Sequence, residues 1–511
     1  MAQAPDFKKL AVIGCGSMGG GMAQLFAENG LHVSLSDPSD QAIDYIMQQA
    51  QKIGIDGRIH KHKVHHGDKF PDYKSLCESL GSPKLFVFSL PHGTVGDAVL
   101  EGLMPYLEKG DIILDCANEH WENTERRQGK CVVRGIRYIG CGVSGGYQAA
   151  RRGPSMCPGS DDESLDIVLP LLRKVAAKDA RGRACVGKAG LGGAGHYVKM
   201  IHNGIEHGMM SAISEAWGIM NWGLGMDNEE VGATFGKWNQ DGGLRGTFLI
   251  DITAKISTMK DPKSNDEYVL NTVVDKVVQD VCGEEGTGVW SNEEAVAQHI
   301  PAPTLTTSHF LRLASADRGQ RARAQQTFGG DWPAQKLDVQ DKAQFLEDLR
   351  MAVYTSCLAA FVQGLNIIES ADRTNKWYIN YTEVLQIWRA GCIIQADGIE
   401  ELIRPIMEGY QEVQKKGDSM NMLFHQHVAK ELKSGMQPLK KVVLKAIEGD
   451  HVIPALGATL DYLKYSTSLD LPTQMTEAQL DYFGKHMYDK KGDPDTADPV
   501  MGKYHFEWKP A

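Results

Sequence analysis

The sequence predicts an α/β Rossmann-type N-terminal domain, followed by a large all-α domain and an extended C-terminal tail. Short apolar runs alternate with helical patterns up to Gly190, which is typical of a parallel, doubly wound sheet. Beyond Gly190 the apolar residues recur at helical spacing, and from Leu471 the chain is rich in Pro, Asp, Lys and Tyr. We therefore expect three domains or segments, at residues 1–190, 191–470 and 471–511.

The expected strands are short apolar runs, most of them followed by a turn that contains Gly or Pro. They cover residues 10–14, 32–37, 84–90, 111–115 and 137–144, with a helix over 22–30 that Gly30 ends. Long helices are expected over residues 194–220, 346–371 and 381–403. The tail cannot pack a core of its own, so it should lie against another surface.

The composition is that of a globular protein, with 42% hydrophobic and 23% charged residues. The formal net charge of −11 argues against a nucleic-acid partner. Ten cysteines without a paired spacing are typical of a cytoplasmic protein with reduced thiols. There is no apolar signal core and no run of about 18 apolar residues, so no membrane association is expected.

Alternating histidines in HKHKVHH, residues 60–66, raise the alternative of a metal site, since alternate side chains of a strand share one face. No carboxylate or cysteine accompanies them. An exposed basic strand is therefore the favoured interpretation, and no metal is expected.

A glycine-rich turn between the first strand and the first helix predicts a dinucleotide site. Its glycines permit a tight turn and let a pyrophosphate approach the amide groups of the helix N-terminus. The alternative is a turn that serves packing alone. The residues of this GxGxxG turn are Gly14, Cys15, Gly16, Ser17, Met18 and Gly19.

The second strand ends in Asp37, which bears on the choice of cofactor. A carboxylate at this position accepts hydrogen bonds from the adenosine ribose hydroxyls and repels a 2′-phosphate. The following residues, Pro38, Ser39 and Asp40, supply no cation. The sequence thus favours NAD, with NADP as the alternative.

Four polar residues share one stripe of the helix expected after Gly190. Lys199, His202, Asn203 and Glu206 lie at i, i+3, i+4 and i+7, and His207 is at the edge of the stripe. An exposed helix face with a weak charge pair is the alternative. Small residues lead into the helix and the dinucleotide domain precedes it, which favours catalysis by Lys199 and Glu206.

A third segment, residues 142–159, follows a strand and is crowded with glycine. Its backbone amides and the Ser144 hydroxyl are suited to hold a carboxylate. The alternative is an irregular structural loop.

Together these segments resemble the decarboxylating 6-phosphogluconate dehydrogenases, within the β-hydroxyacid dehydrogenase superfamily. The shared motifs span nearly the whole chain: VSGGxxxARxGPSxxPG, GHxVKMxHNGIE, GTGxW (286–290), FLEDLR (345–350), IWRAGCII (387–394) and QLDYFGKH (479–486). The resemblance implies a homodimer in which the tail of one subunit completes the active site of its partner.

The resemblance also implies roles for individual residues. Lys199 takes the proton of the 3-hydroxyl as hydride leaves C3 and returns it to the keto oxygen as CO2 leaves, and Glu206 protonates C1 of the enediol. Leu90, Pro91 and Asn118 would contact the cofactor. The substrate would be held by Asn118, Ser144, Gly145, Gly146, His202, Asn203, His207, Glu285, Thr287, Arg312 and His486.

The chain departs from the family pattern where the substrate phosphate is expected. His207 replaces a tyrosine, Glu285 replaces a lysine and Leu480 replaces an arginine, while Arg312 and the tail residue His486 are retained. These changes should weaken dianion binding by several kcal/mol, since charge-assisted hydrogen bonds contribute about 1.5–3 kcal/mol each. Arg318, Arg321 and Arg323 are nearby cations that could compensate.

The leading hypothesis is oxidative decarboxylation of 6-phosphogluconate, or of a closely related sugar acid, to a ketopentose of the ribulose 5-phosphate type. One alternative is a non-decarboxylating β-hydroxyacid dehydrogenase that acts on a non-phosphorylated or differently substituted acid. A non-catalytic, nucleotide-binding paralogue is the other, and the presence of Lys199, Asn203 and Glu206 argues against it.

Overall fold

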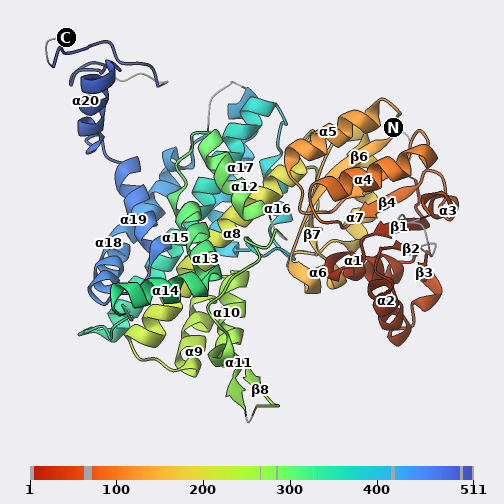
Figure 1. The fold of residues 1–511 in the computed structure, drawn as a ribbon, viewed down its shortest axis with the longest axis horizontal. Coiled ribbons are helices and arrows are strands. Elements are labelled where there is room, and N and C mark those ends of the chain that lie inside the picture. The colour runs from red at the N-terminus through yellow and green to blue at the C-terminus, as the bar shows by residue number, and fades with distance from the viewer. Residues whose placement is uncertain are drawn as a thin grey trace. The chain divides into compact units, whose positions relative to one another are not determined.

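The computed structural model describes residues 5–62, 72–264, 266–283, 286–330, 332–415, 420–494 and 499–508. The chain divides into two compact units, Met1–Thr459 and Leu460–Ala511, which we describe separately. The first unit contains a sheet with its covering helices and a large helical part (Figure 1).

A seven-stranded sheet forms the centre of the N-terminal region. Its order is β3-β2-β1-β4-β5-β6-β7. The chain adds β2 and β3 on one side of β1 and then adds β4 to β7 on the other side, so the strand order reverses at β1. The strands are β1 (Lys9–Ile13), β2 (His32–Ser36), β3 (Ile59–Lys61), β4 (Leu85–Phe88), β5 (Ile112–Asp115), β6 (Arg137–Ser144) and β7 (Ser155–Gly159). All five predicted strands are present.

The five predicted strands pair parallel as expected, and the structure adds β7 at one edge, which pairs antiparallel to β6 with Ser144 opposite Ser155. A parallel connection needs a dozen or more residues, and only residues 145–154 join these two strands. The short helix α6 (Gly146–Arg152) fills this connection, so residues 142–159 form a strand–helix–strand unit and not the irregular loop of the alternative interpretation.

Helices cover both faces of the sheet, and alternate residues of each strand point to opposite faces. In β1, Leu10 and Val12 join one apolar cluster, whereas Ala11 and Ile13 join the other. The first cluster includes residues of α1 (Ser17–Glu28), α2 (Asp40–Lys52) and α7 (Asp162–Val175). The second includes residues of α3 (Tyr73–Glu78), α4 (Thr94–Leu103) and α5 (Trp121–Val132) (Figure 1).

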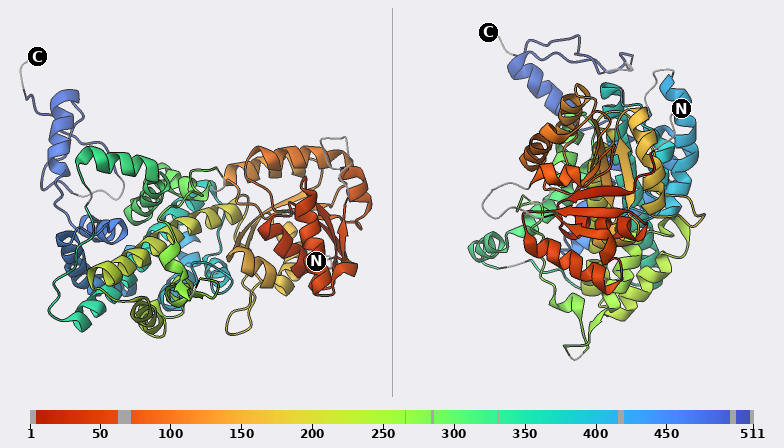
Figure 2. Two further views of the ribbon diagram at one scale, coloured as in Figure 1. Left: turned by 60° about the horizontal axis from the view of Figure 1, so that its bottom comes forward. Right: turned by 90° about the vertical axis from the view of Figure 1, so that its right-hand side faces the viewer.

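The helical part is organised around two long helices, α8 (Ala194–Gly218) and α15 (Lys342–Asn375). Helix α8 packs against α15, α12 (Thr287–Ala297) and α13 (Pro303–Ala316), and its N-terminal part also contacts β6. The left view of Figure 2 shows α8 passing from the sheet into the helices. Because α8 touches both regions, side chains on its first turns can meet the edge of the sheet.

The chain forms further helices, and a short β-hairpin joins two of them. They are α9 (Asn228–Trp238), α10 (Phe248–Thr258), β8 (Lys260–Asp261), β9 (Glu267–Tyr268), α11 (Val269–Thr272), α14 (Arg318–Phe328), α16 (Tyr381–Ile387), α17 (Asp397–Lys415), α18 (Gln426–Glu448) and α19 (Pro454–Ser466).

The single helix predicted over residues 381–403 is wrong. The chain forms α16 and α17 with a break between them, centred on Gly391, which has φ +62°. A Cβ on Gly391 would lie 2.6 Å from Ala177 Cβ and 2.7 Å from Gly153 O, so only glycine fits here. The carbonyl of Gly391 accepts a hydrogen bond from Ser155 N at 3.0 Å, which ties the break to β7.

In the part of the chain that the structure describes, one helix is long and apolar enough to cross a membrane. This is α15, and 94% of its most apolar window is buried inside the protein, as expected for a core helix.

The C-terminal unit departs from the expectation of an extended tail, because it contains the helix α20 (Thr473–Gly484). The buried Asp481 carboxylate accepts hydrogen bonds from His505 Nδ1 at 2.9 Å and from Trp508 Nε1 at 2.8 Å. It also accepts from the backbone amides of Met487 and Phe506. The last described residues therefore fold back onto α20.

Candidate active site

The glycine turn after β1 has the geometry of a phosphate-binding turn. Gly14 has φ +93°, and a Cβ there would lie 2.1 Å from Ser89 O. A Cβ on Gly19 would lie 2.0 Å from Gly14 O, whereas Gly16 faces open space. Gly16 is the N-cap residue of α1 and has no side chain to cap the helix, which leaves the amides of its first turn for an anion. These residues fit a dinucleotide pyrophosphate.

Asp37, half-buried beyond the end of β2, is bonded to the same turn. Its Oδ2 accepts from Cys15 N at 2.6 Å and its Oδ1 accepts from Ser39 N at 2.7 Å. Each carboxylate oxygen has a further lone pair, so Asp37 can still accept from ribose hydroxyls. The neighbouring cation Lys61 is paired with Asp40 and Asp44.

A buried arginine joins the loops that follow β4 and β5. Arg127 Nη1 donates to Glu119 Oε2 at 2.7 Å, and its Nη2 donates to Gly93 O at 2.6 Å. Glu119 also accepts from Gly93 N at 2.9 Å. Burial alone raises the pKa of Glu119, but Asn123 and the charge of Arg127 lower it overall. This cluster fixes the loops that carry Leu90, Pro91 and Asn118, the latter half-buried just after β5.

The first turns of α8 rest on the glycines of β6 and β7. A Cβ on Gly142 would lie 2.2 Å from Lys199 Cβ, and one on Gly159 would lie 2.4 Å from Gly195 N. The buried His196 shares a 3.1 Å contact with Asp115 O and a 2.7 Å contact with Thr124 Oγ1. Small residues thus let the Lys199 stem lie directly against the sheet.

Lys199, Asn203 and Thr287 form a hydrogen-bonded chain. Lys199 Nζ donates to Asn203 Oδ1 at 2.7 Å, and Asn203 Nδ2 donates to Thr287 Oγ1 at 2.6 Å on α12. Asn203 is buried, so its two bonds set the orientation of its amide. The structure brings these three predicted residues together on facing helices.

His202 connects the stripe to Ser144. Its Nδ1 lies 3.0 Å from Asn203 Oδ1, and its Nε2 lies 3.1 Å from Ser144 Oγ and 3.1 Å from Cys392 Sγ. Burial, followed by the positive charge of Lys199, lowers the pKa of His202 to about 3. The ring is therefore neutral, with Nδ1–H donating to Asn203 and Nε2 accepting.

Glu206 lies one turn beyond His202 on the same helix face, and 22% of its side chain is exposed. Its Oε2 is 3.9 Å from His202 Nδ1. Lys199 and Glu206 therefore border the same edge of α8, with His202 and Asn203 between them. A lysine and a half-buried carboxylate so placed can move protons at two positions of one small molecule.

Ser144, Gly145 and Gly146 lie at the end of β6. Gly145 has φ +107° and Gly146 has φ +68°, conformations that favour glycine. The Ser144 hydroxyl also accepts from Ile393 N at 3.3 Å, which brings the break after α16 to the site.

The far end of the stripe holds a buried cluster. Arg312 Nε donates to Asp280 Oδ2 at 2.7 Å, and His309 and His207 stack with ring centroids 5.7 Å apart. Arg312 is thus paired with a carboxylate of its own chain. Glu285 lies outside the residues that the structure describes. His486 follows α20 in the C-terminal unit.

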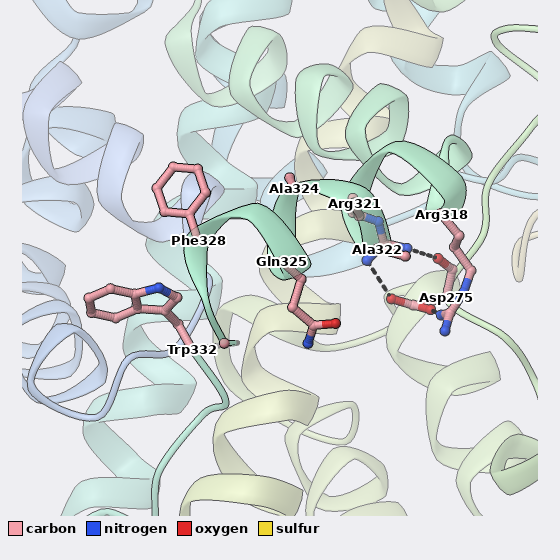
Figure 3. Close-up of a pocket in the computed structure, with 9 residues that line it drawn as sticks. Asp275, Arg318, Arg321, Ala322, Ala324, Gln325, Phe328 and Trp332 are labelled. Carbon is pink, nitrogen blue, oxygen red and sulfur yellow. Dashed lines mark hydrogen bonds and ion pairs between the residues drawn. The ribbon is translucent and has the colours of Figure 1, made fainter.

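The arginines considered as replacement cations line a separate pocket on α14. Arg318 and Arg321 both pair with Asp275, and the pocket continues past Gln325 to Phe328 and Trp332 (Figure 3). None of the predicted substrate residues that the structure describes lines this pocket. Arg323 is exposed on the same helix.

Sequence reasoning missed Asp280, His309, Cys392 and Ile393. Asp280 and His309 belong to no motif and lie far from His207 in the sequence, so no spacing signals their convergence. Cys392 and Ile393 belong to IWRAGCII, where a continuous helix was expected. The structure has a turn there instead, and this turn brings Cys392 to His202 and Ile393 to Ser144.

The fold and the site define an oxidoreductase with a nicotinamide-cofactor domain, acting on a CH–OH group. Residues 9–190 match the NAD binding domain of 6-phosphogluconate dehydrogenase, and residues 195–508 match the C-terminal domain of that enzyme. The chain belongs to the 6-phosphogluconate dehydrogenase family.

Individual relatives match over nearly the whole chain. The decarboxylating 6-phosphogluconate dehydrogenase of Emericella nidulans is 42% identical over 97% of this chain and 100% of its own length. That of Escherichia coli is 33% identical over 98% of this chain and 99% of its own. The 6-phosphogluconate dehydrogenase of Plasmodium falciparum, solved with NADP+ and with 6-phosphogluconate, matches with a TM-score of 0.82 and 30% identity, covering 98% of this chain and 100% of its own.

Proposed function

We propose that this protein oxidatively decarboxylates 6-phosphogluconate, or a closely related sugar acid, to a ketopentose of the ribulose 5-phosphate type with reduction of NAD(P). The observation that carries the proposal is the placement of Lys199 and Glu206 on one edge of α8, beside the sheet end and with Asn203 between them. When bound, the nicotinamide accepts the hydride that leaves C3. The names of the relatives support the substrate.

Lys199 moves the proton of the 3-hydroxyl in this proposal. Its Nζ takes that proton during oxidation and returns it to the keto oxygen while CO2 leaves, because a β-keto acid loses CO2 readily when its keto oxygen is protonated. Asn203 holds Nζ in place at 2.7 Å. Glu206 then protonates C1 of the enediol from the other end of the stripe while the enediol oxygen gives its proton back to Lys199, which completes the ketopentose.

Ser144, Gly145 and Gly146 hold the carboxylate, together with Asn118 and His202. The neutral His202 adds no positive charge to the buried network, so Lys199 remains the group that transfers the proton beside the substrate. Thr287 anchors Asn203 from α12 and positions the middle of the stripe.

A non-decarboxylating β-hydroxyacid dehydrogenase is a second candidate, and one observation favours it. Arg312, the retained arginine of the expected phosphate site, is already paired with the buried Asp280 at 2.7 Å. A substrate without a terminal phosphate would leave this ion pair undisturbed.

We further propose NAD as the preferred cofactor, because Asp37 stands where a 2′-phosphate would be repelled. NADP is the alternative and is the cofactor named for the Plasmodium falciparum structure. We also propose a cytoplasmic homodimer with exchanged C-terminal tails, in which His486 completes the partner's site. The ten cysteines, all free, agree with a reducing compartment. The division at residues 1–190, 191–470 and 471–511 is part of the same proposal.

The test is a substrate panel with both cofactors, measuring NAD(P)H and CO2 from 6-phosphogluconate, gluconate and other aldonates. Equal amounts of the two products from 6-phosphogluconate support decarboxylation, whereas a stable keto acid supports the second candidate. Lys199→Met and Glu206→Gln should each abolish turnover by at least about a hundredfold. No turnover on any acid by the unaltered protein would overturn both candidates.

A further inference from the structure

Three buried side chains converge beyond the Lys199–Glu206 stripe. His207 on α8, His309 on α13 and Asp280 in the segment before α12 are 4%, 3% and 9% exposed. One ligand atom from each lies within 4.8 Å of the other two. His207 Nδ1, His309 Nδ1 and Asp280 Oδ1 are buried atoms that make no hydrogen bond to any residue that the structure describes. Buried polar atoms normally have partners, so three such atoms facing one point call for a shared ligand.

The chemistry of these atoms fits a divalent transition metal ion. Two imidazole nitrogens and a carboxylate oxygen are the donor set of many sites that keep a fourth position open. The two rings must be neutral to bind a metal, and the burial of His207 and His309 disfavours their charged forms. We propose that His207, Asp280 and His309 bind a divalent transition metal ion such as Zn²⁺.

Arg312 and Gly288 shape this site. Arg312 holds Asp280 Oδ2 at 2.7 Å, which leaves Oδ1 turned toward the histidines at 3.9 Å from His309 Nδ1. Ligating carboxylates are commonly fixed by such an outer hydrogen bond. A Cβ on Gly288 would lie 2.6 Å from His207 Cε1, 2.8 Å from Asp280 Oδ1 and 3.0 Å from His309 Nδ1. A side chain at position 288 would thus fill the space beside the three ligands, and glycine leaves that space open.

Zinc bond lengths require the three ligand atoms to move slightly closer together. Zinc bonds of about 2.1 Å place two tetrahedral ligands roughly 3.4 Å apart. The 3.9 Å between His309 Nδ1 and Asp280 Oδ1 is close to that value, and all the separations between ligand atoms are within 4.8 Å.

The position of the site gives the ion a role that rests on the proposed function. His207 is one turn from Asn203 on α8, and Gly288 follows Thr287, which accepts from Asn203. The ion therefore sits at the end of the stripe away from Ser144. With neutral rings, the charges of Asp280 and Arg312 cancel, so the metal adds two positive charges there. Its open position binds the terminal oxyanion of the sugar acid and replaces the cations lost at Glu285 and Leu480.

Metal binding is tested first, on the full-length protein without substrate. Bound metal is first removed from the protein with a chelator. The protein is then titrated with Zn²⁺ in competition with a chromophoric chelator. A parallel titration with Co²⁺ follows the visible absorption of the bound ion. We expect one tight Zn²⁺ per chain, and at least about a hundredfold weaker binding in His309→Gln and in Asp280→Asn. Circular dichroism checks that each variant folds, and His309→Gln leaves the Asp280–Arg312 pair intact.

Two matched variants control for other histidines. His427→Gln changes an exposed histidine on α18, and His62→Gln changes one in the histidine-rich segment 60–66. Both should keep the tight Zn²⁺. The proposal is overturned if the unaltered protein binds no stoichiometric Zn²⁺ at micromolar concentration, or if His309→Gln binds it as tightly.

The substrate role is tested separately by comparing the stripped and Zn²⁺-loaded enzyme. Loading should lower the KM for 6-phosphogluconate at least tenfold and change the KM for gluconate less than twofold. Equal KM values with and without Zn²⁺ would overturn this role. If neither acid is turned over, the proposed function fails, whereas the Zn²⁺ titration still decides the metal site.

Discussion

Asn203 Oδ1 lies 2.7 Å from Lys199 Nζ and 3.0 Å from His202 Nδ1, so one amide oxygen accepts from two donors that differ in charge. Because an amide is neutral, this contact orients Lys199 without strongly stabilising its protonated form. A carboxylate in the same place would do both. The choice of asparagine over aspartate therefore bears directly on the proton chemistry of Lys199.

Asn203→Asp should move the acidic limb of the pH profile of kcat/KM upward by about one pH unit or more. A new negative charge within hydrogen-bond distance raises the pKa of a lysine, and the general base must be deprotonated to act. Asn203→Ser is the matched variant, because it removes the amide without adding charge. We expect it to lower kcat and leave the limb in place. An unmoved limb in Asn203→Asp would contradict the assignment of Lys199 as the base.

Gly142→Ala should reduce both stability and activity. The added Cβ would lie 2.2 Å from Lys199 Cβ, so the lysine stem or the strand must shift. Overpacking of this kind costs about 1–3 kcal/mol, and a displacement near 1 Å lowers the rate by about a hundredfold. Urea denaturation and steady-state kinetics measure the two effects.

Gly129→Ala is the control for this substitution. Gly129 is exposed on α5 and a Cβ there meets nothing within 4 Å. Alanine should therefore raise the free energy of unfolding by about 0.5–1 kcal/mol and leave kcat unchanged. If Gly142→Ala kept full kcat, the close packing of Lys199 on β6 would not be needed for catalysis.

The strand and the helix that carry the site could be predicted from the sequence, because both follow from local apolar patterns. Residues 137–144 form a strand with the predicted bounds, because an apolar run between turns leaves little freedom. The stripe of Lys199 to Glu206 follows from helical periodicity alone. Residues that converge through tertiary structure have no such local signal. Asp280 reaches Arg312 and His309 only because the segment before α12 lies against α13.

In two places long-range packing decides what local pattern does not. The helix expected over 381–403 shows apolar periodicity throughout, but Gly391 must pass beside Gly153 and β7, which breaks it. The last strand runs antiparallel because its connection is too short for a crossover. In both places the outcome depends on a partner far along the chain.

The depressed pKa of His202 predicts a loss of stability on acidification. Its pKa is about 3 in the folded protein against an ordinary value of 6.5, because burial and Lys199 disfavour the charged ring. Between these values the unfolded chain binds a proton that the folded one does not. The contribution of the neutral His202 ring to the free energy of unfolding is therefore fully present above pH 6.5. It falls by about 1.4 kcal/mol per pH unit down to pH 3.

Urea denaturation between pH 7 and pH 5 measures this slope. His202→Asn should lower the number of protons taken up on unfolding, which this slope measures, by up to one. This holds whatever the effect of the substitution on absolute stability. The exposed His427→Asn on α18 is the matched control and should keep the slope of the unaltered protein. An identical slope in His202→Asn would mean that His202 is not held neutral in the folded state.

Cofactor preference should change when the carboxylate beyond β2 is replaced. Asp37→Asn combined with Pro38→Arg removes the charge that repels a 2′-phosphate and adds one that attracts it. The ratio of kcat/KM for NADP to that for NAD should rise at least tenfold, since a charge-assisted hydrogen bond contributes about 1.5–3 kcal/mol. Asparagine can still accept from Cys15 N through its amide oxygen, so the turn is kept. Asp40→Asn, a nearby exposed carboxylate paired with Lys61, is the control and should leave the ratio unchanged. If the double variant also left the ratio unchanged, Asp37 would be a residue that supports the turn and does not select the cofactor.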